Sequence, residues 1–176
     1  MCARGPQPAQ AGERQDLSLD AAAALLAGAR FPVILAGGGV QWSGAADEVC
    51  RMAELTGAPI VTSYGRADAV PNDHPNYLGH LGRLGSAEGI EAVRQADTIL
   101  AVGTRLSQST TFYDNRFIPE DAKIIQIEID PQEIGRNYPV TVGIEGDAKA
   151  VMDGLLEKVR EREPRPNQEW VSEVGD

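Results

Sequence analysis

The sequence predicts an α/β fold: a doubly wound, mostly parallel sheet of five or six strands with helices on both faces, as in Rossmann-like domains. Short apolar runs alternate with longer segments whose apolar residues recur at helical spacing. The apolar runs are continuous, as expected of strands that are covered on both faces. The first of them ends in three consecutive glycines, which is typical of a tight turn from a strand into a helix.

The elements of the first half follow from apolar spacing and end signals. Residues 1–16 hold little that could be buried and predict a linker or a terminal extension. Gly57 favours a left-handed helix end, and Pro59 prevents the helix from continuing. In order, we expect a helix from Ser18, a strand over 31–36, a helix from Ser43 to Gly57, a strand over 59–64 and a long loop over 65–85.

The second half begins with a helix capped by Ser86 and ends with one capped by Asp147. Between and after them we expect a strand over 97–104, an irregular segment over 105–121, strands over 122–130 and 140–144, and a second linker over 164–176. The folded domain is thus expected over residues 17–163. Linkers at both ends predict that this domain belongs to a longer chain.

The charge and cysteine content exclude several classes of function. The formal net charge of −10 argues against nucleic acid and anionic membranes as partners, because both require a basic face. Cys2 and Cys50 form no metal-binding pair and no disulfide framework, which favours a reducing compartment. Without a signal sequence or an apolar stretch long enough to cross a bilayer, the chain is expected to be cytoplasmic.

The carboxyl ends of the expected strands carry glycine, polar or charged residues, and in a doubly wound sheet they meet at one ligand-binding edge. The glycine turn could cradle an anion, or it could be a plain corner. An NAD-type fingerprint is not met, because Trp42 stands where its third glycine belongs and the second strand ends without an acid. Glu128 and Asp130 end the fourth strand instead, where a carboxylate could bind the hydroxyls of a ribose.

Other candidate side chains leave alternatives open. Arg105 could bind a pyrophosphate, or it could pair with Glu128 or Asp130. His80 lies among glycines that allow a ligand to approach, whereas His74 suits a turn. The sequence contains no Ser/His/Asp order, no P-loop and no ligand set for a metal. Residue chemistry alone therefore indicates a nucleotide-binding or scaffold domain rather than a self-sufficient catalyst.

Several strings resemble the central domain of thiamine-diphosphate-dependent enzymes of the acetolactate synthase-like group. They are LAGGGV, APIVTSYGRADAVPNDHPNYLGHLG, ADTILAVGTRL and AKIIQIEIDPQEIGRNYPVTVGIEGDAKAV, in this order. The resemblance covers roughly residues 18–162. It implies a parent carboligase, decarboxylase or acyltransferase with two further domains, which bind the aminopyrimidine and the magnesium-held diphosphate of the cofactor. It also implies a homodimer or homotetramer, and a central domain that is not catalytic by itself.

In this family the central domain holds FAD, ADP or no ligand. The residues that the resemblance implies around an ADP-containing nucleotide are Gly37, Gly38, Gly39, Ser63, Tyr64, Leu78, Gly79, His80, Gly103, Thr104, Arg105, Glu128, Ile129, Gly146, Asp147 and Ala148. The pattern G-x-R-F-D-D-R of the synthases is only half kept, since Leu106 to Ser109 replace its last four residues. This departure favours ADP or an empty site over FAD. The alternative is a ligand-free scaffold and oligomerisation domain.

Overall fold

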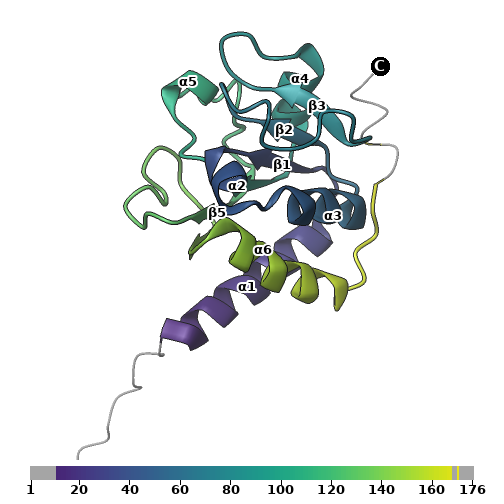
Figure 1. The fold of residues 1–176 in the computed structure, drawn as a ribbon, viewed down its shortest axis with the longest axis vertical. Coiled ribbons are helices and arrows are strands. Elements are labelled where there is room, and N and C mark those ends of the chain that lie inside the picture. The colour runs from purple at the N-terminus through teal and green to yellow at the C-terminus, as the bar shows by residue number, and fades with distance from the viewer. Residues whose placement is uncertain (1–10, 168–169, 171–176) are drawn as a thin grey trace, which may run out of the picture.

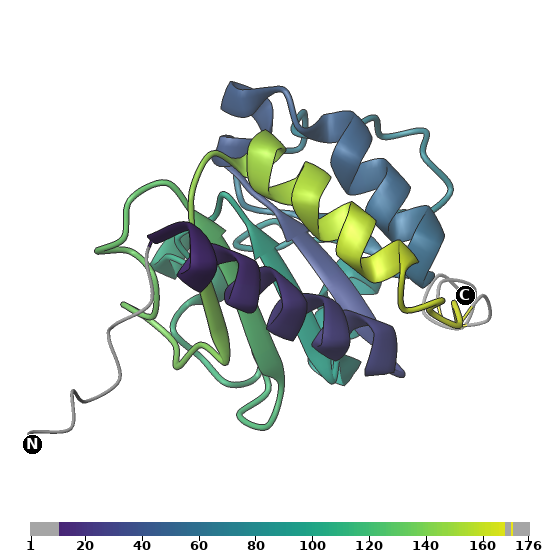
Figure 2. The ribbon, with the colours of Figure 1, turned by 90° about the horizontal axis from the view of Figure 1, so that it is seen from below.

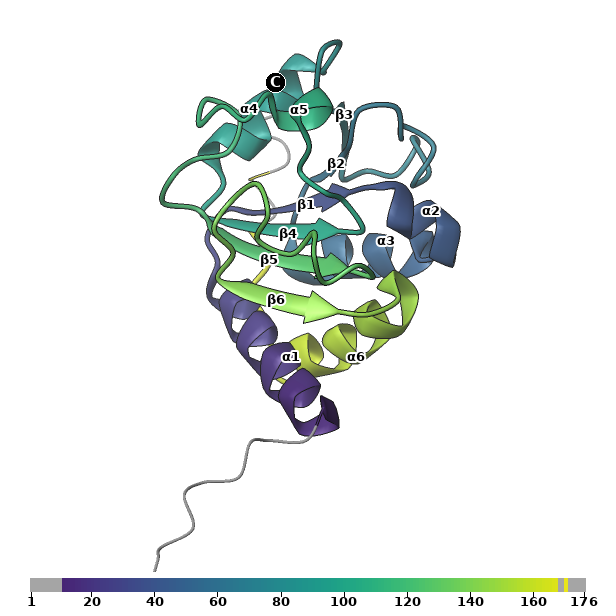
Figure 3. The same cartoon turned by 90° about the vertical axis from the view of Figure 1, so that its left-hand side faces the viewer.

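A computed structural model describes residues 11–167 and Trp170. Its six strands form one all-parallel sheet in the order β3-β2-β1-β4-β5-β6, which confirms the predicted fold class (Figure 1). In Figure 3 the arrows of β1, β4, β5 and β6 point the same way, so their carboxyl ends share one edge. The strands are β1 (Pro32–Ala36), β2 (Ile60–Thr62), β3 (Tyr77–His80), β4 (Thr98–Val102), β5 (Lys123–Glu128) and β6 (Val142–Glu145).

Helices cover both faces of the sheet. On one face α1 (Ala11–Gly28), α6 (Ala148–Arg160) and α3 (Ala46–Thr56) lie side by side (Figure 2). The other face packs on α4 (Ala87–Gln95) and on the segment after β4. Alternate residues of β1 enter the two cores: Ile34 packs with the first group, and Val33 and Leu35 with the second. Both cores are thus built on the same strands, which explains the continuous apolar runs.

The expected caps are present. The Ser86 hydroxyl accepts a hydrogen bond from the Gly89 N–H at 3.2 Å, and the Asp147 carboxylate accepts one from the Ala150 N–H at 3.1 Å. Gly57 ends α3 with φ 70°, the left-handed conformation that favours glycine. These three end signals were predicted from single residues and are confirmed.

Two helix starts differ from the prediction. The first helix begins at Ala11 rather than Ser18, so residues 11–16 of the expected linker are helical. The helix expected from Ser43 begins at Ala46 as α3, and a further helix, α2 (Gly38–Ser43), precedes it. Gly44, at φ 67°, and Ala45 separate the two helices. Helical spacing did not reveal α2, because its first two residues are glycines with low helix propensity. Residues 1–10, including Cys2, lie outside the described residues.

Two segments that were expected to be irregular contain short elements. The loop over 65–85 contains β3, an edge strand that pairs only with β2. The backbone N–H of Ile60 donates to the Asn76 carbonyl at 2.7 Å and begins this pairing. The segment over 105–121 contains α5 (Gln108–Thr111). Both are too short, and too rich in glycine or polar residues, to show a period in the sequence.

Trp170 packs against the amino end of β1. It lies within the expected linker over 164–176, yet its side chain is only 1% exposed and belongs to the core on the α4 face. Its ring lies 5.0 Å from that of Phe31, and its indole N–H donates to the Pro32 carbonyl at 3.0 Å. An indole that is both buried and hydrogen-bonded in this way contributes to stability.

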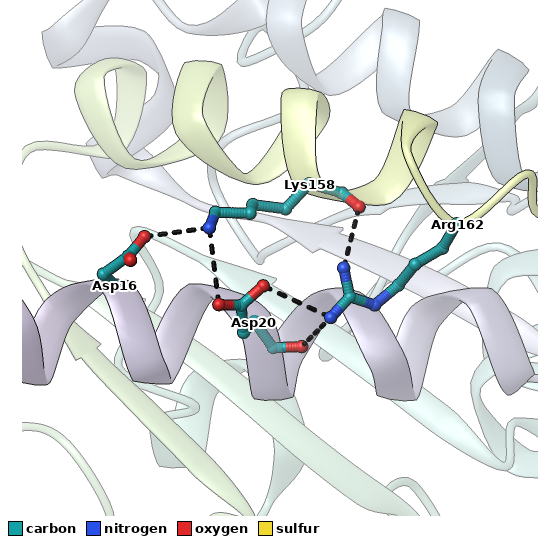
Figure 4. A network of polar contacts seen from close by, with 4 residues as sticks. All are labelled: Asp16, Asp20, Lys158 and Arg162. Atoms are coloured by element: carbon teal, nitrogen blue, oxygen red, sulfur yellow. Dashed lines mark hydrogen bonds and ion pairs between the residues drawn. The ribbon is translucent and has the colours of Figure 1, made fainter.

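An ionic cluster joins α1 to the end of α6 (Figure 4). The Lys158 ammonium lies 3.0 Å from a carboxylate oxygen of Asp16 and 3.3 Å from one of Asp20. The Arg162 guanidinium lies 3.2 Å from the other oxygen of Asp20 and also donates to the Asp20 and Lys158 carbonyls. The two cations also lie near the negative end of the α6 dipole. The cluster therefore fixes how α1 lies across α6.

Replacing Trp170 by alanine is expected to lower the free energy of unfolding by about 3–5 kcal/mol, because a buried ring and its hydrogen bond are lost. Chemical denaturation measures this change. The matched control is Trp42→Ala, since Trp42 is 84% exposed and its removal should change the stability by no more than about 0.5 kcal/mol. Equal effects of the two substitutions would contradict the packing of Trp170.

The contribution of Asp20 to stability should depend on pH. Loss of hydration disfavours its charged form, but Lys158 and Arg162 outweigh this and lower the pKa of the Asp20 carboxyl below its ordinary value. Its contribution is therefore complete above the unfolded pKa of about 3.9 and is lost as the pH falls through the lower folded pKa. We expect Asp20→Asn to lower Tm at pH 7, with a difference from the unsubstituted chain that shrinks below pH 4.

Asp153→Asn serves as the control for this series, because Asp153 is exposed on α6 and makes no ion pair with any described residue. Its Tm difference should stay small throughout. A difference for Asp20→Asn that remains constant from pH 7 to pH 3 would show that the ion pairs do not act as described.

Candidate functional site

A cavity of ≈ 650 Å³ lies at the carboxyl edge of the sheet. It lies at the turns that follow the neighbouring strands β1 and β4, where the strand order reverses. From β1 the chain continues to β2 on one side, and from β4 it continues to β5 on the other side. Doubly wound sheets bind ligands at this switch point, and the volume is in the ordinary range for a small-molecule site.

Most of the predicted site residues line this cavity. They are Gly38, Gly39, Ser63, Tyr64, Gly103, Thr104, Arg105, Glu128, Ile129, Gly146, Asp147 and Ala148. The lining also includes residues that the sequence analysis did not select, namely Trp42, Ser43, Arg66, Ser107, Ser109, Thr110 and Ile127. All of these except Ile127, which lies within β5, follow a strand end by four to eight positions. Extending the search for site residues by two helical turns beyond each strand would have found them.

Gly37, Leu78, Gly79 and His80 do not line the cavity. The last three form the edge strand β3, where the Ser86 hydroxyl donates to the Leu78 carbonyl at 2.6 Å. Gly79 has φ 98°, and a Cβ there would lie 2.3 Å from the Ser86 oxygen. Gly79 therefore allows β3 to pack closely against the start of α4. His74 has the expected turn role, since its Nδ1 accepts a hydrogen bond from the Asn76 N–H at 3.2 Å.

The turns after β1 and β4 are in direct backbone contact. A Cβ at Gly37 would lie 2.3 Å from the Gly103 oxygen, and one at Gly39 would lie 2.6 Å from the Gly103 Cα. The N–H of Gly37 donates to the Val102 carbonyl at 2.9 Å, and that of Gly39 to the Gly103 carbonyl at 3.0 Å. Two amides of the expected anion cradle are thus already bonded within the protein. Only the Gly38 N–H of this turn makes no hydrogen bond to another described residue.

A buried hydroxyl pair joins the ends of β2 and β4. The oxygens of Ser63 and Thr104 lie 2.8 Å apart, and both residues are buried. Because β1 lies between these two strands, the hydrogen bond passes across the end of β1. The absence of a side chain at Gly37 makes this possible, since a Cβ there would lie 2.6 Å from that of Thr104.

Glu128 provides a carboxylate at the end of β5. It is only 7% exposed, and its Oε1 accepts a hydrogen bond from the Ile129 N–H at 3.0 Å. Asp130 does not line the cavity; its carboxylate accepts a hydrogen bond from the Gln132 N–H in the following turn. Of the two acids considered from the sequence, Glu128 is therefore the one available to a ligand.

Arg105 is exposed at the cavity and makes no ion pair with any residue in the described range, so the alternative of a salt bridge to Glu128 or Asp130 is wrong. Side-chain amides hydrogen-bond to the backbone at Arg105 and at the residue before it. The Asn137 amide donates to the Arg105 carbonyl at 2.8 Å, and the buried Gln126 amide donates to the Thr104 carbonyl at 3.3 Å. Gln126 also accepts a hydrogen bond from the Gly135 N–H, so the turn after β5 supports the segment that carries Arg105.

The side chains that could bind a metal ion or act as a nucleophile are few among the described residues. Within them, no cluster of three His, Cys, Asp or Glu side chains could hold a metal ion. Burial, with smaller effects from Asp47 and Glu54, raises the pKa of the Cys50 thiol, so Cys50 is not an activated nucleophile. None of the described helices is long and apolar enough to span a bilayer.

The strand order and the position of the cavity define a doubly wound α/β domain with Rossmann-like topology. Residues 19–155 match the family model described as the central domain of thiamine pyrophosphate enzymes. The chain belongs to this family, which confirms the resemblance noted in the sequence.

Curated relatives include two kinds of enzyme. The chain is 46% identical over 144 residues to a sulfoacetaldehyde acetyltransferase of Roseovarius nubinhibens, covering 81% of this chain and 24% of the relative. It is 40% identical over 158 residues to a probable acetolactate synthase large subunit of Methanocaldococcus jannaschii, covering 90% and 27%. An acetolactate synthase of Mycobacterium avium is 41% identical over 138 residues, covering 78% and 22%. The chain thus spans about a quarter of the length of these relatives.

Gly103→Ala is expected to lower the free energy of unfolding by at least about 2 kcal/mol. Gly103 has φ 56°, which a residue with a Cβ adopts only with strain, and the new Cβ would lie 2.5 Å from the Gly39 Cα. Chemical denaturation measures the loss.

Gly65→Ala is the matched control for Gly103→Ala. Gly65 has φ 72°, but a Cβ there would meet nothing within 4 Å, so only the backbone strain of about 1–2 kcal/mol is expected. The difference between the two variants measures the contact between the β1 and β4 turns. Equal losses would show that this contact does not constrain the fold.

Proposed function

We propose that the cavity binds an ADP-containing nucleotide in a structural or regulatory role. The observation that carries this proposal is the buried carboxylate of Glu128, at the end of β5, beside the unpaired Arg105 at the end of β4. A carboxylate accepts hydrogen bonds from ribose hydroxyls, and a guanidinium binds phosphate oxygens. Both residues line the same cavity, so they could contact adjoining parts of one nucleotide.

The cavity wall also offers apolar surface for a base. Ile129, just after Glu128, is 69% exposed, and Trp42 of α2 is 84% exposed. Single exposed apolar side chains are common on protein surfaces, but these two line the same cavity. With the ribose at Glu128 and the phosphates directed toward Arg105, the purine base would stack on this apolar surface.

ADP fits the site better than FAD. The synthase pattern after β4 has two acids and a second arginine, and this chain has Ser107, Gln108 and Ser109 in their place. The backbone of Leu106, at φ 48°, turns its buried side chain into the core on the α4 face. Flavin contacts that depend on the missing residues cannot form, whereas the proposed ribose and phosphate contacts do not involve them.

The parent protein is proposed to be a thiamine-diphosphate-dependent transferase or lyase of the acetolactate synthase-like group. In this proposal, other domains of the same chain would hold thiamine diphosphate with magnesium. The cofactor would supply a nucleophilic carbon for cleaving a 2-oxo acid or a related substrate, and the resulting two-carbon unit would be transferred to an acceptor. The parent enzyme is proposed to be a homodimer or a homotetramer. The described residues of this domain support the other domains and take no part in the reaction.

A second candidate is a ligand-free scaffold, and one observation favours it. Two positions that could bind an anion are already filled by protein groups: the Gly103 carbonyl accepts from Gly39 at the start of α2, and Asp147 caps α6. A scaffold would keep these contacts and leave the cavity to solvent or to a neighbouring domain.

Calorimetric titration with ADP separates the two candidates. We expect saturable binding of ADP, and weaker binding of 2′-deoxy-ADP because one ribose hydroxyl is lost. Glu128→Gln should weaken ADP binding by about tenfold and reduce the preference over the deoxy nucleotide, since a charged acceptor is replaced by a neutral one. A titration with FAD should give weaker binding than ADP.

Glu145→Gln is the matched control, because Glu145 pairs with Glu128 in the register of β5 and β6 but does not line the cavity. It should leave ADP binding unchanged. Quenching of Trp42 fluorescence gives a second readout. Trp170 lies at the opposite end of β1, so its fluorescence should not change when a ligand binds in the cavity. If neither ADP nor FAD produces heat or a thermal shift, the nucleotide site is refuted and the scaffold is favoured.

A further inference from the structure

The cavity contains a second unpaired arginine that the sequence patterns did not indicate. Arg66 follows β2, on the opposite side of β1 from Arg105. It is exposed and makes no ion pair within the part of the chain that the structure describes. Its guanidinium lies over the glycine turn, since a Cβ at Gly38 would be 2.9 Å from the Arg66 Nε. Gly38 is thus the glycine against which the Arg66 side chain rests.

The backbone that carries Arg66 is anchored on several sides. The Arg66 N–H donates to the Ser63 carbonyl, and the Ala69 N–H donates to the Arg66 carbonyl, each at 3.0 Å. The Gln41 amide of α2 donates to the Asp68 carboxylate at 2.7 Å. Ala69 itself is buried in the core. Arg66 therefore extends from a fixed turn, so less ordering is needed when it binds a ligand.

The strand ends that carry the two arginines are tied together. The buried hydrogen bond between Ser63 and Thr104 joins residues that lie three positions before Arg66 and one position before Arg105. Two cationic forks are thus held on either side of the β1 turn, and the Gly38 N–H between them is not bonded to another described residue. In a chain with a net charge of −10, two unpaired arginines at one cavity indicate an anionic ligand.

We propose that Arg66 and Arg105 form a two-arginine clamp for the diphosphate of the ligand. This assignment rests on the proposed nucleotide site and specifies its phosphate end. Guanidinium forks bind phosphate oxygens in a bidentate manner, and two forks on opposite sides suit a group with two linked phosphates. The clamp takes over the role first expected of the glycine turn, whose Gly37 and Gly39 amides are bonded to the β4 turn.

The test compares ligands that differ in phosphate number. Calorimetric titration of the 176-residue chain with adenosine, AMP and ADP should show affinity rising with each phosphate. Arg66→Ala is expected to weaken ADP binding by about ten- to a hundredfold while leaving adenosine binding unchanged, because charge-assisted hydrogen bonds to phosphate are lost. Arg66→Lys should recover only part of the loss, since it keeps the charge without the fork.

Arg51→Ala is the matched control. Arg51 is exposed on α3, makes no ion pair with the described residues and does not line the cavity, so its loss changes the net charge by the same amount. ADP affinity should change by less than about twofold in this variant, because exposed charges at a distance are screened. Arg66→Ala should retain the Tm of the unsubstituted chain, since its side chain makes no hydrogen bond within the described region.

Inorganic pyrophosphate separates a failure of the clamp from a failure of the nucleotide site. Pyrophosphate binding that is lost in Arg66→Ala supports the clamp. If pyrophosphate binds in this way and ADP does not bind, the nucleotide proposal alone fails. ADP binding that Arg66→Ala and Arg51→Ala weaken equally overturns the clamp and leaves the nucleotide site intact. An absence of binding by both ADP and pyrophosphate overturns both proposals.

Discussion

The backbone contact between the turns after β1 and β4 is the constraint on which the rest of the site depends. Gly37, Gly39 and Gly103 allow two main-chain segments to meet where any Cβ would collide. This contact brings the ends of β2 and β4 close enough for Ser63 and Thr104 to share a hydrogen bond across β1. Arg66 and Arg105 follow these two joined strand ends. The three glycines therefore shape the site through the packing of its backbone.

Much of the fold could be predicted from the sequence because its signals are local. Continuous apolar runs indicate strands covered on both faces, and Ser86 and Asp147 cap helices through residues only three positions away. The edge strand β3 and helix α2 were missed, since tertiary contacts stabilise them against weak local propensity. At the site, strand ends located Glu128 and Arg105, but the approach of Arg66 to Gly38 depends on the turn over 63–69, which no spacing rule describes.

The charge distribution reconciles an acidic chain with an anionic ligand. Several cations of the described region are paired elsewhere, as in the cluster of Lys158 and Arg162 with Asp20 that joins two helices. The arginines at the cavity are left unpaired, so two cationic groups are available there in a chain of negative net charge. Such a site favours a compact anion and disfavours an extended polyanion such as nucleic acid, which would also meet the surrounding carboxylates.

The packing of Trp170 links the C-terminal end of the described chain to the hydrophobic core on the α4 face of the sheet. The chain leaves α6, which covers one face of the sheet, and places its indole in the core on the other face, against Phe31 and Pro32. One segment thus spans both hydrophobic cores at the amino end of β1. Neither helical layer can peel from the sheet without disturbing this segment, so the domain should open as a single cooperative unit in hydrogen exchange rather than layer by layer.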